Sequence, residues 1–233
     1  MRGVSTPTAS LEKASAEQVL EHVLERFHPR LALACSFQKE ESVLVDMLLR
    51  LEPGARVFTI DTGVLFEETR ETWRRFEERW GVHVEVFDAL SPDGRPWTAE
   101  RCCSEQKVAA LDEALGGLDA WITGLRREQA PTRTAAPKLT HDDARGVWKA
   151  SPLADWTERE VWAYLAEHEL PYHPLHDRGY ASIGCAPCTQ PGAGREGRWA
   201  GSDQVECGLH VDDPPGANGP SGANGPPGAE GSR

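Results

Sequence analysis

Two tight pairs of cysteines are the residues whose type and spacing most clearly indicate chemistry: Cys102, Cys103, Cys185 and Cys188. Paired thiols at short spacing are typical of zinc sites, iron-sulfur clusters and redox dithiols. Directly adjacent ligands suit a cubic iron-sulfur cluster better than a tetrahedral zinc site. The spacing therefore favours iron-sulfur, with zinc, and small buried hydrophobic thiols, as the alternatives.

The remaining two cysteines differ in their surroundings. Cys207 lies in a Glu-Cys-Gly-Leu-His segment that ends at His210, and Arg195 and Arg198 lie shortly before it. A reactive thiol needs a lowered pKa, access and neighbouring cations or a base. Cys207 is therefore a candidate nucleophile, with an incidental surface thiol as the alternative. Cys35, inside an apolar run, is expected to be a core residue.

Candidate anion-binding groups lie where predicted strands end. Ser36 opens a loop between a strand and a helix, and the free N–H groups of a helix N-terminus favour phosphate. The sequence has no Walker-type Gly-Lys-Ser, which disfavours ordinary kinase or GTPase chemistry. Arg126, Arg127 and Arg133 surround another predicted strand end, and Lys107 lies one helical turn beyond Cys103. Solvated surface charges are the alternative reading of each.

Alternating strands and helices must position these groups. We expect strands at 31–35, 56–60, 82–87 and 120–123, and helices at 15–27, 41–51, 66–80 and 98–115, the last with the paired cysteines in its first turns. This alternation predicts an α/β fold, a parallel sheet with helices on both faces. Ligands of such folds bind beyond the carboxyl ends of the strands.

The pattern changes after Lys138. A loop-rich stretch at 148–156 precedes a helix expected from Thr157 to His168, and an irregular, Cys-rich segment spans 171–210. From Gly216 onward Gly recurs at every third position, but so few prolines favour disorder over a collagen helix. We expect a flexible N-terminus at 1–14, one domain at 15–210 and a disordered tail at 211–233.

Composition excludes several classes of function. The 233 residues include 37 acidic and 25 basic ones, and the net charge of -12 disfavours binding to nucleic acid or to an anionic membrane. No apolar run reaches the ~18 residues that span a bilayer, and the first residues lack the order of a secretory signal. We therefore expect a cytoplasmic protein, whose thiols a reducing environment keeps free.

At this level of detail the chain resembles the iron-sulfur subgroup of assimilatory adenylyl-sulfate (APS) reductases, within the APS/PAPS reductase family. The resemblance covers residues 15–210. The matching stretches are 36–47, 61–63, 101–103 with Lys107, 122–129 with Pro131 and Arg133, 152–156, 176–180, 182–188 and 206–210.

The resemblance implies a Rossmann-like fold of the PP-loop type, that of the adenine nucleotide alpha hydrolases. It implies a [4Fe-4S] cluster on Cys102, Cys103, Cys185 and Cys188, and Cys207 as the nucleophile. It also implies a set of substrate-binding residues: Ser36, Thr62, Lys107, Arg126, Arg127, Arg195, Arg198 and His210.

The activity implied is reduction of adenosine 5′-phosphosulfate to sulfite and AMP, in sulfate assimilation toward cysteine. The reaction would pass through an S-sulfonate on Cys207, with thioredoxin or a glutaredoxin-like protein as the electron donor. The oligomeric state, including a homo-oligomer, is left open.

The sequence departs from the family pattern at two places. Gln38 stands where a small residue is common, which could narrow the approach of phosphate to the backbone. Gln190 replaces a common Arg, and the stretch from there to Arg195 is shortened, so the partners of Arg195 and Arg198 are open.

Three rival functions remain. The first is reduction of the 3′-phosphorylated nucleotide (PAPS), although that subgroup generally lacks the four cysteines. The second is an iron-sulfur PP-loop enzyme that modifies tRNA, which the acidic composition disfavours. The third is a non-catalytic redox sensor or zinc-stabilised adenylate-binding module, which would keep its function without Cys207.

Overall fold

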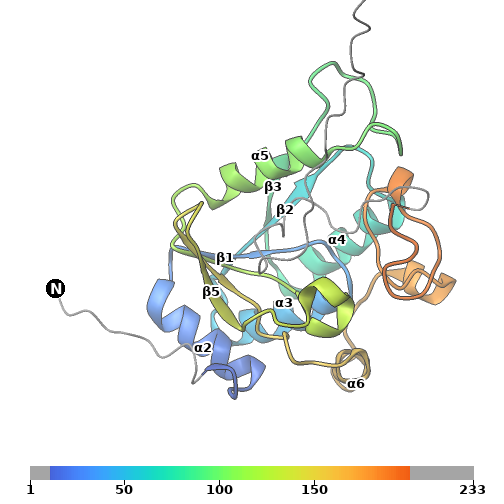
Figure 1. The fold of residues 1–233 in the computed structure, drawn as a ribbon. Helices are drawn as coiled ribbons and strands as arrows, with labels where there is room; N and C mark the ends of the chain where they lie inside the picture. The colour runs from blue at the N-terminus through green and yellow to red at the C-terminus, as the bar shows by residue number, and fades with distance from the viewer. Residues whose placement is uncertain (1–10, 200–233) are drawn as a thin grey trace, which may run out of the picture.

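The computed structural model describes residues 11–199, which fold around a six-stranded sheet (Figure 1). Its strands run in the order β3-β2-β1-β4-β6-β5. They are β1 (Leu31–Ala34), β2 (Arg56–Asp61), β3 (Val84–Asp88), β4 (Ala120–Ile122), β5 (Leu139–Asp142) and β6 (Val147–Ala150). Every neighbouring pair is parallel except β5 and β6. The predicted α/β architecture is confirmed.

The helices are α2 (Ala16–Phe27), α3 (Lys39–Leu51), α4 (Glu67–Trp80), α5 (Ser104–Leu115) and α6 (Glu158–Glu167). Helices α3, α4 and α5 connect successive parallel strands, whereas α2 precedes β1 and α6 follows β6, and local sequence sets the ends of these helices. Ser15 and Gln18 form the capping box of α2, in which the Gln18 N–H donates to Ser15 Oγ over 3.2 Å. Gly81 ends α4 with a φ of 64°, a left-handed conformation that glycine adopts without steric cost.

The two faces of the sheet bury different sets of side chains. In β1, Leu31 and Leu33 pack into the larger core with residues of α2, α3 and α6. Ala32 points the other way and packs with Phe58 and with Leu111 of α5. Because successive strand residues point to opposite faces, a strand apolar at every position must be covered on both sides. Figure 1 shows α5 on one side of the sheet and α2 and α3 on the other.

The helix expected over 98–115 is wrong in its first turns. Helix α5 begins at Ser104, and Cys103 is its N-cap. Before it, Thr98 and Arg101 close a turn through two backbone hydrogen bonds, and the Arg101 guanidinium donates to Asp93 Oδ1 over 2.6 Å. These local bonds replace the helical ones, so the paired cysteines lie on a loop rather than along one face of a helix.

The stretch after Lys138 contains a β-hairpin that the sequence analysis did not predict. Strand β6 adds to the sheet beside β4, and β5 pairs with it antiparallel. Each strand has four residues. Such short strands carry too little alternation to be recognised without their sheet neighbours.

The N-terminal boundary of the packed chain lies earlier than residue 15. Leu11 is buried in the larger core, and Glu12 forms an ion pair with Arg127. Within residues 11–199, no helix has the length and apolarity needed to cross a membrane.

The central strand gives a first testable prediction. Leu33 is fully buried in β1, so Leu33→Ala should lower the free energy of unfolding by about 2–5 kcal/mol through lost burial and a cavity. Urea denaturation measures this. The control Leu51→Ala, at a side chain 38% exposed, should change stability by only about 0.5 kcal/mol. Equal effects of the two substitutions would contradict this account of the core.

Candidate active site

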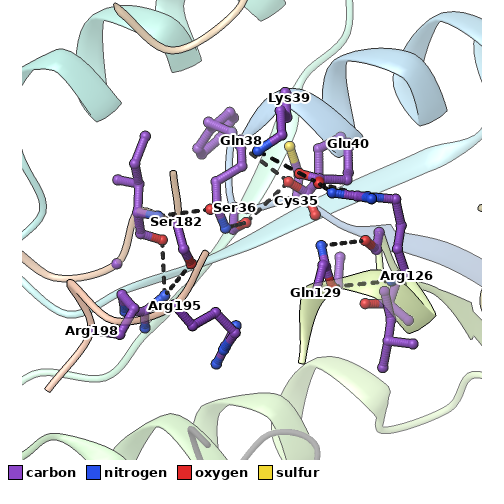
Figure 2. Close-up of a pocket in the computed structure, with 18 of the residues that line it drawn as sticks. Cys35, Ser36, Gln38, Lys39, Glu40, Arg126, Gln129, Ser182, Arg195 and Arg198 are labelled. Atoms are coloured by element: carbon purple, nitrogen blue, oxygen red, sulfur yellow. Dashed lines mark hydrogen bonds and ion pairs between the residues drawn. The ribbon is translucent and has the colours of Figure 1, made fainter. Parts of the chain in front are cut away.

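A cavity of about 220 Å³ lies at the carboxyl ends of β1 and β4, where the strand order reverses. The chain leaves β1 toward one edge of the sheet and leaves β4 toward the other, which opens a crevice between the two loops. The cavity is lined by three segments above all: residues 34–41, 123–126 and 181–185. In Figure 2, the loop carrying Ser36 and Gln38 lies between Arg126 on one side and Ser182 and Arg198 on the other.

The loop after β1 is anchored by Phe37. Its φ of 60° is in the left-handed region, which is strained for a residue with a side chain. The ring is buried, stacks on Trp73 with centroids 5.4 Å apart, and meets Phe76 edge-on at 5.5 Å. This packing holds the backbone turn that carries Ser36 into the first turn of α3, whose N–H groups can bind an anion.

Glu40 is buried at the start of α3 and is held by cations. The Arg126 Nε and Nη2 atoms both lie 2.9 Å from Glu40 Oε1, and Lys39 Nζ lies 3.9 Å from it. Burial alone would raise the pKa of Glu40, but the charges of Lys39 and Arg126 outweigh it and lower that pKa. Glu40 is therefore an ionised carboxylate inside the fold.

Glu41, next to it, has the opposite character. Its Oε2 accepts hydrogen bonds of 3.1 Å from Ser36 Oγ and from the backbone N–H of Gln38. Burial, and then the charge of Glu40, raise the pKa of Glu41 to about 8. Gly124 makes room for the Glu41 carboxyl group and for the Cβ of Glu40, because a Cβ at Gly124 would lie 2.6 Å from Glu41 Oε1 and 2.9 Å from Glu40 Cβ. At neutral pH, Glu41 thus adds little negative charge to the loop.

The arginines after β4 are occupied by protein partners. Arg126 lines the cavity, yet its Nη1 also donates to Glu128 and to the Trp156 carbonyl. Arg127 donates to the Ala136 carbonyl over 2.8 Å and pairs with Glu12, and it is not among the cavity-lining residues. The structure therefore places Arg127 away from the cavity and shows Arg126 paired with the buried Glu40 and the exposed Glu128.

Three other cations of the predicted substrate-binding set line the cavity, Lys107, Arg195 and Arg198, and the candidate Arg133 lines it as well. Arg198 Nη1 donates to the Ile183 carbonyl over 3.2 Å, and its guanidinium lies 4.5 Å from the Trp199 ring centroid. A Cβ at Gly184 would lie 2.5 Å from that guanidinium, so the glycine permits the close approach. The shortened stretch before Arg195 thus still brings both arginines to the cavity.

The two cysteine pairs meet at the same wall. Cys103 Sγ lies 3.8 Å from Cys185 Sγ, although 82 residues separate them in the chain. Cys185 also lines the cavity, and Thr62 Oγ1 lies 3.2 Å from its sulfur. Thr62 is buried against this thiol rather than lining the cavity.

Neighbouring groups shift the pKa of Cys185 toward the thiolate and those of Cys103 and Cys188 away from it. The hydrogen bond from Cys103, and then the positive charge of Lys107, lower the pKa of Cys185 against the effect of burial. Burial, and then the charges of Cys185 and Cys102, raise the pKa of Cys188. No three Cys, His, Asp or Glu side chains within residues 11–199 are arranged as a ready metal site. An all-thiol set from two facing segments nevertheless fits the donors of an iron-sulfur cluster.

Cys207 and His210 lie outside the described residues. Lys39, Glu40 and Glu41, to which the sequence analysis assigns no individual role, also line the cavity. The signal that could have found them is a run of charged residues directly after an apolar strand, at the position where parallel sheets bind ligands.

The pKa of Glu41 gives a testable pH dependence. Because it is raised to about 8 in the fold from its usual 4.5, the stability contributed by the protonated carboxyl is full below about pH 4.5 and lost as pH rises through 8. Glu41→Gln keeps the acceptor oxygen without the titration. The variant should gain stability relative to the parent protein as pH rises from about 5 to 9, on the order of a few kcal/mol in total.

Urea denaturation at several pH values measures that difference. The control Glu21→Gln, at an exposed position of α2, should follow the parent protein at every pH. Parallel pH profiles for Glu41→Gln and the parent would show that Glu41 does not take up a proton in the fold.

Comparisons with known proteins agree with this site. The model of the phosphoadenosine phosphosulfate reductase domain matches residues 30–191. The adenosine 5′-phosphosulfate reductase of Salinibacter ruber is 41% identical over 227 residues, covering 90% of each chain. That of Geobacillus thermodenitrificans is 40% identical over 215 residues, covering 86% of this chain and 92% of the relative.

A solved structure shares the fold. The crystal structure of phosphoadenylyl-sulfate reductase from Candida auris, in a phosphate complex, superposes with a TM-score of 0.64 at 25% identity, covering 77% of this chain and 92% of that one. The resemblance seen in the sequence is thereby confirmed: the chain belongs to the APS/PAPS reductase family of oxidoreductases.

Proposed function

We propose that this protein reduces adenosine 5′-phosphosulfate to sulfite and AMP, with a thioredoxin-type dithiol as the electron donor, in the reducing cytoplasm. One observation carries the proposal: Cys185 lines the same cavity as Ser36, so a thiol-rich wall and an anion-binding loop face one another. The two relatives named above, both called adenosine 5′-phosphosulfate reductase, support the choice of substrate.

The cavity offers distinct surfaces to the two halves of this nucleotide. Apolar and aromatic side chains line one part and suit the adenine ring: Ala34, Ile60, Leu111 and Trp121. Ser36 and the N-terminus of α3 suit the phosphate. Lys107, Arg195 and Arg198 supply the positive charge that the sulfate end requires.

In the reaction we infer, the thiolate of Cys207 attacks the sulfur of the sulfuryl group. The new S–S bond forms as the S–O bond to AMP breaks, and AMP leaves with the electron pair. The product is an S-sulfonate on Cys207. Because an anion attacks an anion, the cations around the cavity must neutralise the developing charge.

A dithiol donor then completes the reduction. One of its thiolates attacks the Cys207 sulfur, and sulfite leaves with the electron pair. The second thiol attacks the resulting mixed disulfide, which frees the Cys207 thiolate and leaves the donor as a disulfide. Two electrons thus pass from the donor to the sulfuryl group. The family resemblance implies that His210, three residues after Cys207, binds the same anion.

We infer that a [4Fe-4S] cluster is held by Cys102, Cys103, Cys185 and Cys188. When bound, it would join the two cysteine segments and set a fixed charge beside the cavity. Lys107 lies near both the cavity and the proposed cluster ligands, because it lines the cavity and its charge lowers the pKa of Cys185. Thr62 holds the Cys185 sulfur in place from the other side.

The choice between the two nucleotides is directly testable. Anaerobically purified protein with thioredoxin should release sulfite from adenosine 5′-phosphosulfate at a rate at least about 10-fold above that from the 3′-phosphorylated form, a difference of about 1.4 kcal/mol. Cys207→Ser should abolish release while keeping AMP binding. Without reductant, mass spectrometry should find a sulfonate adduct on Cys207.

The outcomes separate the rival functions. No sulfite from either nucleotide would overturn the proposal in favour of a binding module or sensor. Preference for the 3′-phosphorylated form would reassign the substrate to the one named for the Candida auris protein. An adduct that persists in Cys207→Ser would show that a different group is the nucleophile.

The cluster has its own test. Protein purified anaerobically should contain iron and sulfide and absorb near roughly 400 nm, as thiolate-ligated iron does. Cys103→Ser should lose the iron, whereas Cys35→Ala, at a buried thiol far from the paired cysteines in sequence, should keep it. Stoichiometric zinc in place of iron would refute the assignment.

A further inference from the structure

Two side chains at the start of α3 reach across the cavity to the segment that leads to Cys185. Gln38 Oε1 accepts a 2.8 Å hydrogen bond from the backbone N–H of Ile183. Lys39 Nζ donates to the Ala181 carbonyl over 3.1 Å. Figure 2 shows Gln38 lying between Ser36 and Ser182. These contacts join parts of the chain more than 140 residues apart in sequence.

Both contacts are held in place by further bonds. Lys39 is only 3% exposed, and its Nζ also lies 3.4 Å from Glu158 of α6. A buried cation must keep its partners, because losing one leaves charge without compensation. The other end of Gln38 donates from Nε2 to Ser36 Oγ over 3.1 Å. Gln38 therefore contacts the anion-binding loop and the 181–185 segment at the same time.

The 181–185 segment brings the Gln38 contact close to Cys185, because Ile183 lies two residues before Cys185. From the opposite side, Arg198 donates to the Ile183 carbonyl, so the two contacts hold the same residue through its N–H and its C=O. Thr189 Oγ1 donates to the Cys185 carbonyl over 2.9 Å, and the N–H of Ala186 donates to the Val64 carbonyl over 2.9 Å. Hydrogen bonds thus connect Ser36 through Gln38 with Ile183, and the covalent backbone leads from there to Cys185.

We propose that Gln38 and Lys39 are positioning residues that couple the nucleotide loop to the cysteine wall, so that nucleotide binding and retention of the cluster strengthen each other. The coupling rests on the proposed function. This coupling gives a role to Gln38, although the size of its side chain was expected to narrow the approach of phosphate to the backbone. A small side chain at this position could not reach Ile183, and the loop and the wall would then respond to their ligands separately.

Coupling of this kind is reciprocal and can be measured from either ligand. AMP is the probe, and calorimetry gives its Kd with iron-loaded and with metal-free protein. We expect the loaded protein to bind AMP about 5-fold or more tightly, and AMP to slow iron loss to a chelator by a comparable factor. In Lys39→Met and in Gln38→Ala, both ratios should fall toward 1.

A metal-free measurement tests the same connection. In reduced protein without iron, AMP should slow the alkylation of Cys185 by iodoacetamide. Peptide mass spectrometry measures the rate of this alkylation. The two variants should lose this protection. The control Ser15→Ala removes the N-cap of α2, far from the cavity, and should keep the parent ratios even though it lowers Tm.

The outcomes distinguish this proposal from the function on which it rests. Variants that keep the parent ratios, or a parent protein whose AMP affinity does not depend on the cluster, would overturn the coupling while leaving the reductase intact. Protection of Cys185 by AMP that both variants lose, in a protein that takes up no iron, would support the coupling and reject the cluster.

Discussion

Two adjacent carboxylates buried directly beneath an anion-binding loop are the constraint on which this site depends. Left ionised and unpaired, Glu40 and Glu41 would repel a phosphate and would be costly to bury. The fold resolves this in two ways: Arg126 and Lys39 neutralise Glu40, and a raised pKa keeps Glu41 protonated near neutrality. Gly124 supplies the space for the Glu41 carboxyl group and for the start of the Glu40 side chain.

This arrangement separates two of the predicted arginines from the other cations of the site. Arg126 is paired with carboxylates, and Arg127 contacts Glu12 outside the cavity. Further cations also line the cavity: Lys39, Lys107, Arg133, Arg195 and Arg198. The charges of Lys107 and Arg198 also lower the pKa of Cys185, so these two residues act on the anion-binding cavity and on the thiol wall.

Much of the architecture follows from local pattern. The apolar run at β1, the capping box at Ser15 and the glycine at Gly81 each encode an element end, and the structure confirms all three. Prediction failed at two places, one decided by side-chain bonds within a loop and one by pairing with a distant strand. The first turns expected for α5 gave way to a turn fixed by Arg101 and Asp93, and the β5–β6 hairpin exists because β4 offers it an edge.

For the site, sequence alone determined which residue types are present, namely paired thiols and a polar loop after a buried strand. Its motifs also determined the family. Only the tertiary structure decided how the charges are paired. A guanidinium has the same chemistry in Arg126 and Arg127, but the carboxylates Glu40 and Glu12 that pair with them come from distant parts of the chain. Electrostatic pairing depends on distance and burial, which one-dimensional spacing does not specify.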